Sequence, residues 1–155
     1  MPTPIERTVA EWHRFLAGER PGALDDLLHD DVVFLSPIVF TPQRGKELTK
    51  LYLRGAGASF GVDSLGESGG ASAEASGSGA FHYVKEVVGD HHAVLEFEVV
   101  VDGIQVNGVD ILTVDDDGKI VEFKVMLRPL KAIELMHRLM REAMAPLGGA
   151  GSPTA

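Results

Sequence analysis

The first half of the chain carries apolar residues at the spacing of amphipathic helices. Between residues 4 and 17, large apolar side chains recur every three or four positions, with Thr3 available as a cap and Pro4 suited to the first turn. A second short helix fits residues 21–28, which show one apolar face. Gly45 leads into a third helical pattern. Three helices are therefore predicted before the middle of the chain.

Short β-rich runs separate the second and third of these helices. Residues 32–35 form such a run, which stops at Ser36, and the polar residues 29–31 before it predict a turn. Residues 38–40 then fit a short return strand that ends before Pro42. We expect a small strand pair at this point of the fold.

The second half of the chain has the pattern of a β-meander followed by one helix. Four β-rich segments are separated by short Gly-Asp, Asp-Gly and Asp-rich turn signals, and they cover residues 81–88, 93–101, 104–114 and 119–127. Connections this short force neighbouring strands to run antiparallel. Apolar residues between 133 and 144 predict a final helix.

Alternation along these strands predicts which side chains face inward. Successive strand residues point to opposite faces, so the inner face carries Leu95, Phe97, Val99 and Val101 of one strand and Val121, Phe123, Val125 and Leu127 of another. Ile120 falls on the outer face in this pattern. Residues 104–114 are apolar on both faces, with Asp110 among the inward positions. A strand of this kind predicts cover on both sides of the sheet.

Residues 55–79 differ from the rest in composition. Gly, Ser and Ala dominate, and the residues available for burial are Phe60, Val62 and Leu65. The segment is interpreted as a mobile loop, either a disordered linker or a lid that those three side chains close over a ligand. We expect one domain over residues 1–145, with this loop inside it and a flexible tail at 146–155.

Composition excludes several classes of function. With 14 basic and 23 acidic residues, the formal charge of −9 disfavours nucleic acids and anionic membrane surfaces. The chain has no cysteine, and no stretch of about 18 apolar residues follows its unremarkable N-terminus. Gly55-Ala-Gly57 follows a helix rather than a strand and does not predict a phosphate cradle. We expect a cytoplasmic protein that uses no cofactor.

The order of elements resembles a known superfamily over roughly residues 5–128. The matching stretches are 22–37 (GALDDLLHDDVVFLSP), Gly45 before the third helix, and 106–127 (VNGVDILTVDDDGKIVEFKVML). The chain is similar here to the nuclear-transport-factor-two-like superfamily, also called SnoaL-like or ketosteroid-isomerase-like. The resemblance implies an α+β fold in which a cone-shaped, curved antiparallel sheet is wrapped by three N-terminal helices around an apolar cavity. The helix near the C-terminus would be an addition.

Ketosteroid isomerases within that superfamily suggest a role for one carboxyl group. The resemblance places their protonated aspartic acid, which donates a hydrogen bond to a developing enolate, on Asp110. Their first-helix tyrosine falls on Trp12, and their carboxylate base falls on Ser36. In the similar limonene epoxide hydrolases, the catalytic arginine falls on Gly108. Neither full catalytic set is therefore present.

Asp110 is the strongest candidate for chemistry, because a carboxylate on an apolar inward face is costly unless it is hydrogen-bonded, neutral or used. The alternative is a structural acid held by a nearby Trp, Tyr or amide donor. Trp12 is either that donor, a ligand contact or a core residue, and His13 beside it points about 100° away, toward the surface. Polar points of a cavity are also offered by Ser36, Tyr52, Tyr83 and Asn107.

A ligand in the cavity is predicted to contact residues of the inner face. With Asp110 as the catalytic residue, the ligand-binding set comprises Trp12, Ser36, Tyr52, Leu95, Phe97, Val99, Leu112, Phe123, Val125 and Leu127. His82, His91 and His92 do not predict a metal site, because adjacent strand or turn side chains point apart and no carboxylate triad shares their face.

Two functions are compatible with these residues. The first is an acid–base isomerase, cyclase or hydrolase of a polyketide, terpenoid or steroid-like compound, in which Asp110 is the acid, or the base if its partner is a donor. The second is a non-catalytic ligand-binding or dimerisation module. A homodimer through the outer sheet face is expected in either case, centred on Val94, Val100, Ile111 and Met126 and flanked by Glu96, Glu98, Glu122 and Lys124.

Overall fold

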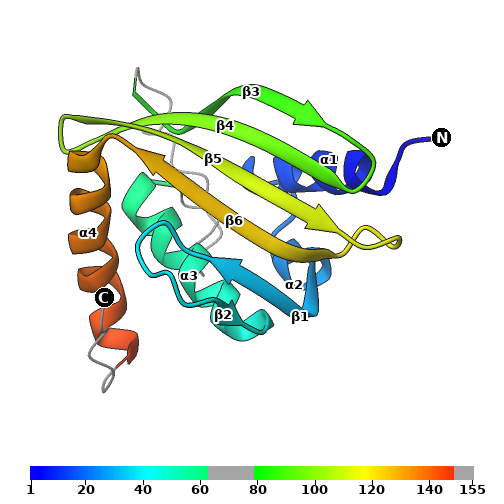
Figure 1. The fold of residues 1–155 in the computed structure, drawn as a ribbon, viewed down its shortest axis with the longest axis horizontal. Helices are drawn as coiled ribbons and strands as arrows, with labels where there is room; N and C mark the ends of the chain where they lie inside the picture. The colour runs from blue at the N-terminus through cyan, green and yellow to red at the C-terminus, as the bar shows by residue number, and fades with distance from the viewer. Residues whose placement is uncertain (63–78, 149–155) are drawn as a thin grey trace.

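The computed structural model describes the backbone of residues 1–62 and 79–148 and the side chains up to residue 142. Figure 1 shows helices and strands of one sheet in this part of the chain. In chain order the elements are α1 (Pro4–Leu16), α2 (Ala23–Leu27), β1 (Leu28–Leu35), β2 (Gln43–Arg44), α3 (Lys46–Phe60), β3 (His82–Val88), β4 (His92–Val101), β5 (Ile104–Val114), β6 (Ile120–Arg128) and α4 (Leu130–Gly148). The fold class is α+β, as predicted.

The N-terminal helices follow their sequence signals closely. In α1, the Thr3 hydroxyl accepts from the Glu6 amide while the Glu6 carboxylate accepts from the Thr3 amide, which is a capping box, and Pro4 stands in the first turn. The second helix is shorter than predicted, since Gly22 has a left-handed backbone with φ 79° and the helix begins after it. Both helices bury their apolar faces against the sheet.

The strand pair between α2 and α3 differs from the prediction. Residues 29–31 belong to β1 and do not form a turn. They lie between Leu28 and Val33, which both pair with β6, and this long-range pairing on either side overrides their polar composition. Residues 38–40 form no strand, and Phe40 is 99 % exposed. The short partner of β1 is instead β2, Gln43–Arg44.

The sheet is mixed and open, with strand order β2-β1-β6-β5-β4-β3. The predicted antiparallel meander is confirmed for β3 to β6. Between β4 and β5, Asp102 and Gly103 both have positive φ, of 51° and 76°, as a two-residue hairpin turn requires. The prediction of an entirely antiparallel sheet is wrong, since β1 runs parallel to β6. The chain makes that parallel connection through the helix, hairpin and meander between the two strands.

The predicted inner face of the sheet is the buried one. Leu95, Phe97, Leu112 and Phe123 are at most 1 % exposed and belong to the apolar core. Residues of α1, α2 and α3 share that core, so the three N-terminal helices cover one face of the sheet, as Figure 1 also shows. Ile120 is an exception to the predicted pattern. It is fully buried, because the register shifts between Thr113 and Val114 on its partner strand.

The bounds of the predicted loop and tail also differ from the structure. Helix α3 continues through Gly55 to Phe60, so the first six residues of the predicted 55–79 loop are helical. Helix α4 runs to Gly148, three residues into the predicted tail. It stands at one end of the sheet, beside the turn between β4 and β5, and packs against α3, β5 and β6 (Figure 1). Residues 63–78 and 149–155 lie outside the described part of the chain.

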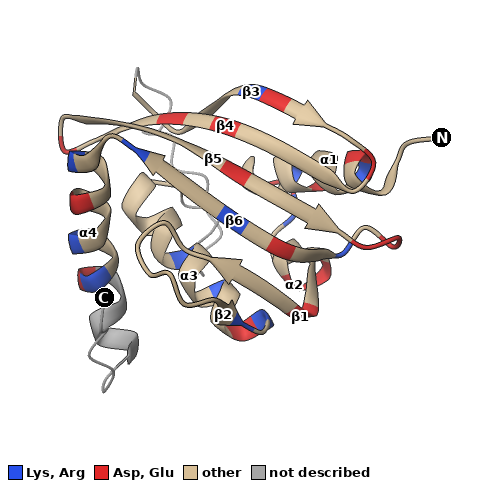
Figure 2. Ribbon diagram, in the orientation of Figure 1, with Lys and Arg blue, Asp and Glu red and all other residues tan. Residues whose placement is uncertain are grey.

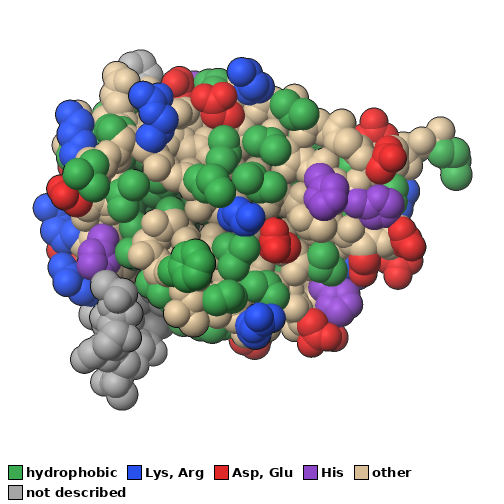
Figure 3. Space-filling model, in the orientation of Figure 1, with side chains coloured by type: hydrophobic (Ala, Val, Ile, Leu, Met, Phe, Trp, Pro, Cys, Tyr) green, Lys and Arg blue, Asp and Glu red, His purple; other side chains and the backbone are tan. Residues whose placement is uncertain are grey.

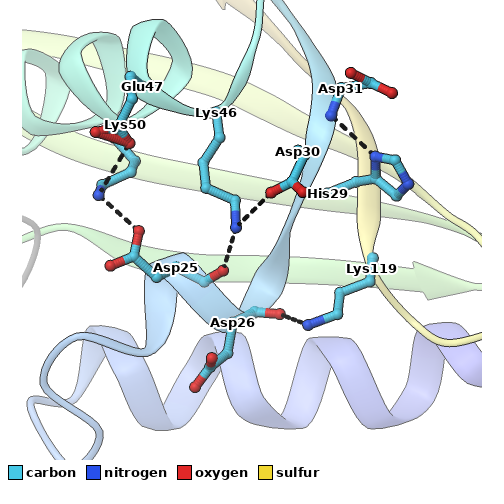
Figure 4. A network of polar contacts seen from close by, with 9 residues as sticks. All are labelled: Asp25, Asp26, His29, Asp30, Asp31, Lys46, Glu47, Lys50 and Lys119. Carbon is cyan, nitrogen blue, oxygen red and sulfur yellow. Dashed lines mark hydrogen bonds and ion pairs between the residues drawn. The ribbon is translucent and has the colours of Figure 1, made fainter.

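Lysine side chains join α2, β1 and α3 into one unit, as Figure 4 shows. The Lys46 ammonium donates to the Asp25 carbonyl at 2.7 Å and pairs with Asp30 at 3.2 Å. The Lys50 ammonium donates to the Asp25 carboxylate at 2.6 Å, and this contact lowers the pKa of that carboxyl. From the β6 side, Lys119 donates to the Asp26 carbonyl. These contacts anchor the helices that cover the inner face near β1.

Charged residues are distributed over the outside of this fold. Figure 2 shows both signs of charge along β3, β6 and α4, with acidic residues grouped at the turn after β5. No helix in the described ranges combines the length and the apolar character needed to span a lipid bilayer.

Candidate functional site

Asp110 lies in the middle of the buried face of β5. Its neighbours across the sheet are Leu95 on β4 and Val125 on β6, both apolar. The side chain is 6 % exposed, and among the buried residues that the structure describes it is the only one that ionises in the ordinary pH range. The inward position predicted for this carboxyl group is thus confirmed, and it stands in surroundings that stabilise the neutral acid.

Two side chains from other elements form a chain of hydrogen bonds that ends at this carboxyl group. The Tyr83 hydroxyl on β3 donates to Asp110 Oδ2 at 2.6 Å, and the Trp12 indole Nε1 on α1 donates to the Tyr83 oxygen at 2.9 Å. Because an indole N–H can only donate, the Tyr83 hydroxyl accepts from Trp12, and its own proton is free to point to Asp110 Oδ2. The hydrogen-bond chain therefore has a fixed direction, and it occupies Oδ2 and leaves Oδ1.

Burial and this hydrogen bond have opposite effects on Asp110. Loss of solvent raises the pKa of the carboxyl from 3.8 to about 7, although the hydrogen bond from Tyr83 acts to lower it. Burial and the neighbouring carboxyl also raise the pKa of the Tyr83 hydroxyl well above its usual value. Tyr83 therefore stays a donor at neutral pH, while Asp110 populates both its acid and its base form.

Helix α1 contributes both predicted and unpredicted contacts to this group. Trp12 is 2 % exposed and packs edge-on against Phe123, so it is at once a core residue and the donor to Tyr83. His13 was predicted to face the surface, and its side chain is 39 % exposed. It also pairs with Glu86 on β3 and packs edge-on against the Tyr83 ring. Glu86 was not singled out from the sequence.

The remaining polar candidates have local partners. The Ser36 hydroxyl accepts hydrogen bonds from the amides of Ile38 and Val39, at 3.0 and 3.3 Å, and so shapes the turn after β1. Tyr52 is half-buried and stacks on Phe34, and burial raises the pKa of its hydroxyl. Contact of Ser36 or Tyr52 with a ligand stays a prediction.

The apolar residues predicted to contact a ligand lie together on the concave side. Leu95, Phe97, Val99, Leu112 and Phe123 are buried in the core, while Val125 and Leu127 are partly buried against it. They form two apolar clusters, and Tyr83 and Val125 pack against both. Asp110 therefore stands where the two clusters meet. Whether these residues touch a ligand stays a prediction.

Gly108 lies two residues before Asp110 on the same face, at the position where limonene epoxide hydrolases have their arginine. A Cβ atom added there would meet Phe97 Cζ at 2.6 Å, Leu127 Cδ2 at 2.7 Å and the Met126 carbonyl oxygen at 2.7 Å. These atoms occupy the space above the strand, so even a methyl group at this position would force its neighbours to shift. The arginine chemistry of limonene epoxide hydrolases has no room at this position.

The three histidines considered as metal ligands each have a partner other than Asp110. His82 contacts the Ala80 carbonyl, His91 pairs with Asp116 and His92 contacts Thr113. Among the described residues no three potential ligands gather into a metal site.

Of the three side chains predicted to close a lid, two are described. Phe60 packs from α3 against Phe81 and Phe97, and Val62 packs against the larger apolar cluster. Both are therefore parts of the packed interior in this structure. Leu65, the third, lies outside the described residues.

Comparisons with known proteins agree with this architecture. No family model matches the chain, and no curated protein matches its sequence. A steroid delta-isomerase from Pseudomonas aeruginosa superposes with a TM-score of 0.79 at 28 % identity, covering 97 % of this chain and 98 % of the isomerase. A protein with a cystatin-like fold from Silicibacter pomeroyi superposes with a TM-score of 0.63 at 24 % identity, over 87 % of this chain and 83 % of its own.

A third similar structure is described as NTF2-like. An NTF2-like protein of unknown function from Mesorhizobium loti superposes with a TM-score of 0.56 at 17 % identity, over 81 % of this chain and 92 % of its own. With its element order and its helices on one face of a bent meander, the chain has the NTF2-like fold. The resemblance seen in the sequence is thereby confirmed.

Proposed function

We propose that this protein is an acid–base enzyme of the isomerase, cyclase or hydrolase type, acting on an apolar small molecule held between the sheet and its helices. The observation that carries the proposal is Asp110, a carboxyl group buried between apolar strand neighbours and held by one donor. Such a group costs stability, because a shape-matched neutral side chain would avoid the penalty of burying a charge. Costs of this kind are concentrated at functional sites.

The protonation behaviour of Asp110 suits proton transfer at neutral pH. A pKa of about 7 lets the same group accept a proton in one step and return it in another. Because its partner Tyr83 is a donor, Oδ2 remains an acceptor, and Oδ1 is the atom that meets the substrate. Movement of a double bond next to a carbonyl needs one proton removed from carbon and one returned, with no net change. The similarity to a steroid delta-isomerase favours this reaction within the class.

Turnover assays on Asp110→Asn test this proposal. The amide keeps the shape and can accept from Tyr83 but cannot take up a proton, so we expect a loss of about 100-fold or more in kcat on a β,γ-unsaturated steroid ketone or another isomerisable enone or epoxide. Glu98→Asn, which removes an exposed carboxylate from β4, is the control and should keep full activity. Equal turnover by both variants and the wild type would exclude Asp110 from the chemistry.

A non-catalytic ligand-binding module is the second candidate. It is favoured by the absence of a second buried carboxyl group among the described residues and by the use of the Ser36 hydroxyl in a local turn. In that case Asp110 gives a single hydrogen bond to a bound molecule. Saturable binding of enones or epoxides without turnover, weakened by Asp110→Asn, distinguishes the module from the enzyme.

We also propose that the protein is a homodimer through the outer face of the sheet, in the cytoplasm as the sequence predicts. Figure 3 shows apolar side chains gathered at the centre of this face with both signs of charge beside them. Val100 and Met126 are 43 % and 51 % exposed, which is unusual for strand residues in mid-sheet. A two-fold contact would bury them against their own copies.

The mass in solution tests the dimer. Light scattering at micromolar concentration should give twice the chain mass of 16.6 kDa. Met126→Glu should shift it to the monomer, because two such carboxylates would face each other near the two-fold axis. Lys131→Glu on α4, an exposed position away from the sheet face, serves as the control and should remain dimeric. A monomeric wild type would contradict the proposal.

A further inference from the structure

Strand β3 places two polar side chains on the inner side of the sheet that ordinary alternation would separate. Tyr83 stands opposite Phe97, and Glu86 stands opposite Leu95, with a register shift between Tyr83 and Lys85. Phe97 and Leu95 are two apart and both buried, whereas Tyr83 and Glu86 are three apart. A regular strand would send residues three apart to opposite faces, so the bulge is what brings both to the same face.

Helix α1 contacts Tyr83 from two directions. Trp12 donates to its hydroxyl, and the His13 ring lies edge-on to the tyrosine ring, with centroids 5.5 Å apart and planes at 84°. Neighbouring residues on a helix point about 100° apart, so the tyrosine is contacted on two different sides. Its hydroxyl then has one further partner, Asp110.

The pair of His13 and Glu86 joins the helix to the strand that carries Tyr83. His13 Nε2 contacts Glu86 Oε1, and the two side chains are 39 % and 37 % exposed. Within the described residues, strand β3 is an edge strand that pairs with β4 alone, and it is bulged at this point. Contacts to α1 therefore contribute to its position more than they would for a strand held on both sides.

We propose that His13, held by Glu86, is a positioning residue for Asp110: it keeps the Tyr83 hydroxyl on Oδ2 and thereby leaves Oδ1 for the ligand. This proposal rests on the acid–base role of Asp110. The groups that face the site are His13 and Trp12 from α1, Tyr83 and Glu86 from β3, and the apolar Leu95 and Val125 beside Asp110. The hydrogen bonding of Asp110 then depends on His13 and Glu86, a half-exposed pair between α1 and β3.

Two substitutions of Glu86 separate positioning from a plain effect of charge. Removing a nearby negative charge lowers the pKa of a carboxyl group, whereas loss of the Tyr83 hydrogen bond raises it. Glu86→Ala removes both the charge and the contact to His13. Glu86→Gln removes the charge but keeps an oxygen that can accept from the His13 ring. The positioning role therefore predicts opposite outcomes for the two variants.

The measurement is a ¹³C NMR titration of the aspartate side-chain carboxyl carbons in the full chain, with Asp110 assigned from Asp110→Asn. Tyr83→Phe removes the hydrogen bond completely and gives the largest expected effect, a rise of about one unit or more in the pKa of Asp110. We expect a rise of about half a unit in Glu86→Ala and a return to the wild-type value, or slightly below, in Glu86→Gln. Glu98→Gln, on the outer face of β4, is the control and should not move it.

An unchanged or lowered pKa of Asp110 in Glu86→Ala would overturn the positioning role. Because the titration needs no substrate, its outcome is independent of whether the enzyme assays succeed. Loss of turnover in Asp110→Asn without a shift in Glu86→Ala would keep the proposed function and reject this inference. A raised pKa of Asp110 in Glu86→Ala without any turnover by the wild type would keep the positioning role of His13 and reject the proposed function.

Discussion

Asp110→Asn should stabilise the protein at pH 8 and leave its stability nearly unchanged at pH 4. In the folded protein the pKa of Asp110 is about 7, against 3.8 when the group is solvated. Between these values the folded state holds a proton that the unfolded state has released, so the free energy of unfolding falls as the pH rises. At about 1.4 kcal/mol per unit, the loss approaches roughly 4–5 kcal/mol above pH 7. The asparagine variant cannot ionise and avoids this loss.

Urea unfolding of both proteins at half-unit steps from pH 4 to 8.5 measures the effect. The difference in unfolding free energy between variant and wild type isolates Asp110, because every other group titrates in both proteins. It should grow through the window from about pH 4 to 7 and then level off. A difference that stays constant would show that the pKa of Asp110 is unshifted by folding, and one that increasingly favours the wild type toward pH 8 would show that the fold stabilises the ionised carboxylate. If Asp110→Asn gains stability and loses turnover, the carboxyl group lowers the stability of the fold and is needed for activity.

Gly108→Ala should destabilise the protein by about 1–3 kcal/mol, although alanine usually suits a strand better than glycine. The added methyl group would lie 2.6–2.7 Å from Phe97, Leu127 and the Met126 carbonyl oxygen. The two side chains can turn aside, but the backbone carbonyl of the neighbouring strand cannot move without disturbing the ladder. The effect is therefore expected toward the upper end of that range, and Gly108→Val should cost more.

The control for this prediction is Gly89→Ala. A Cβ atom at Gly89 would have its nearest contact at 3.5 Å, an ordinary van der Waals distance. Its effect on the free energy of unfolding should stay within about 0.5 kcal/mol. If Gly108→Ala were as mild as this control, the space above β5 next to Asp110 would be open, and a larger side chain or a ligand could enter there.

The meander and the face that each long strand buries could be predicted from local patterns along the chain. Alternation in β4, β5 and β6 repeats every two residues, so the inward side of Leu95, Asp110 and Phe123 follows from parity alone. Turn dipeptides such as Asp102-Gly103 mark the strand ends, because residues with positive φ are required there. Both signals are local in the chain, and both are legible without a structure.

Pairings between distant segments could not be predicted in the same way. The polar residues 29–31 favour a turn by composition, yet they lie in β1, because the positions on either side of them, Leu28 and Val33, pair with β6 about ninety residues later in the chain. Ile120 is buried against its predicted face because a register shift lies between Thr113 and Val114. A bulge reverses parity for every residue beyond it, and no local pattern in these strands announces one.

Which of the candidate donors reaches Asp110 depends on contacts between distant parts of the chain. Trp12 and Tyr83 are 71 positions apart and Tyr83 and Asp110 are 27 apart, so the two contacts depend on how α1 packs on the sheet and on how β3, β4 and β5 pair. The bulge that brings Glu86 to the inner face, and so to His13, is likewise a property of strand pairing. Residue type and parity predicted a buried acid. Whether it meets a donor, another carboxylate or empty space depends on long-range packing, which determines its pKa and therefore its chemistry.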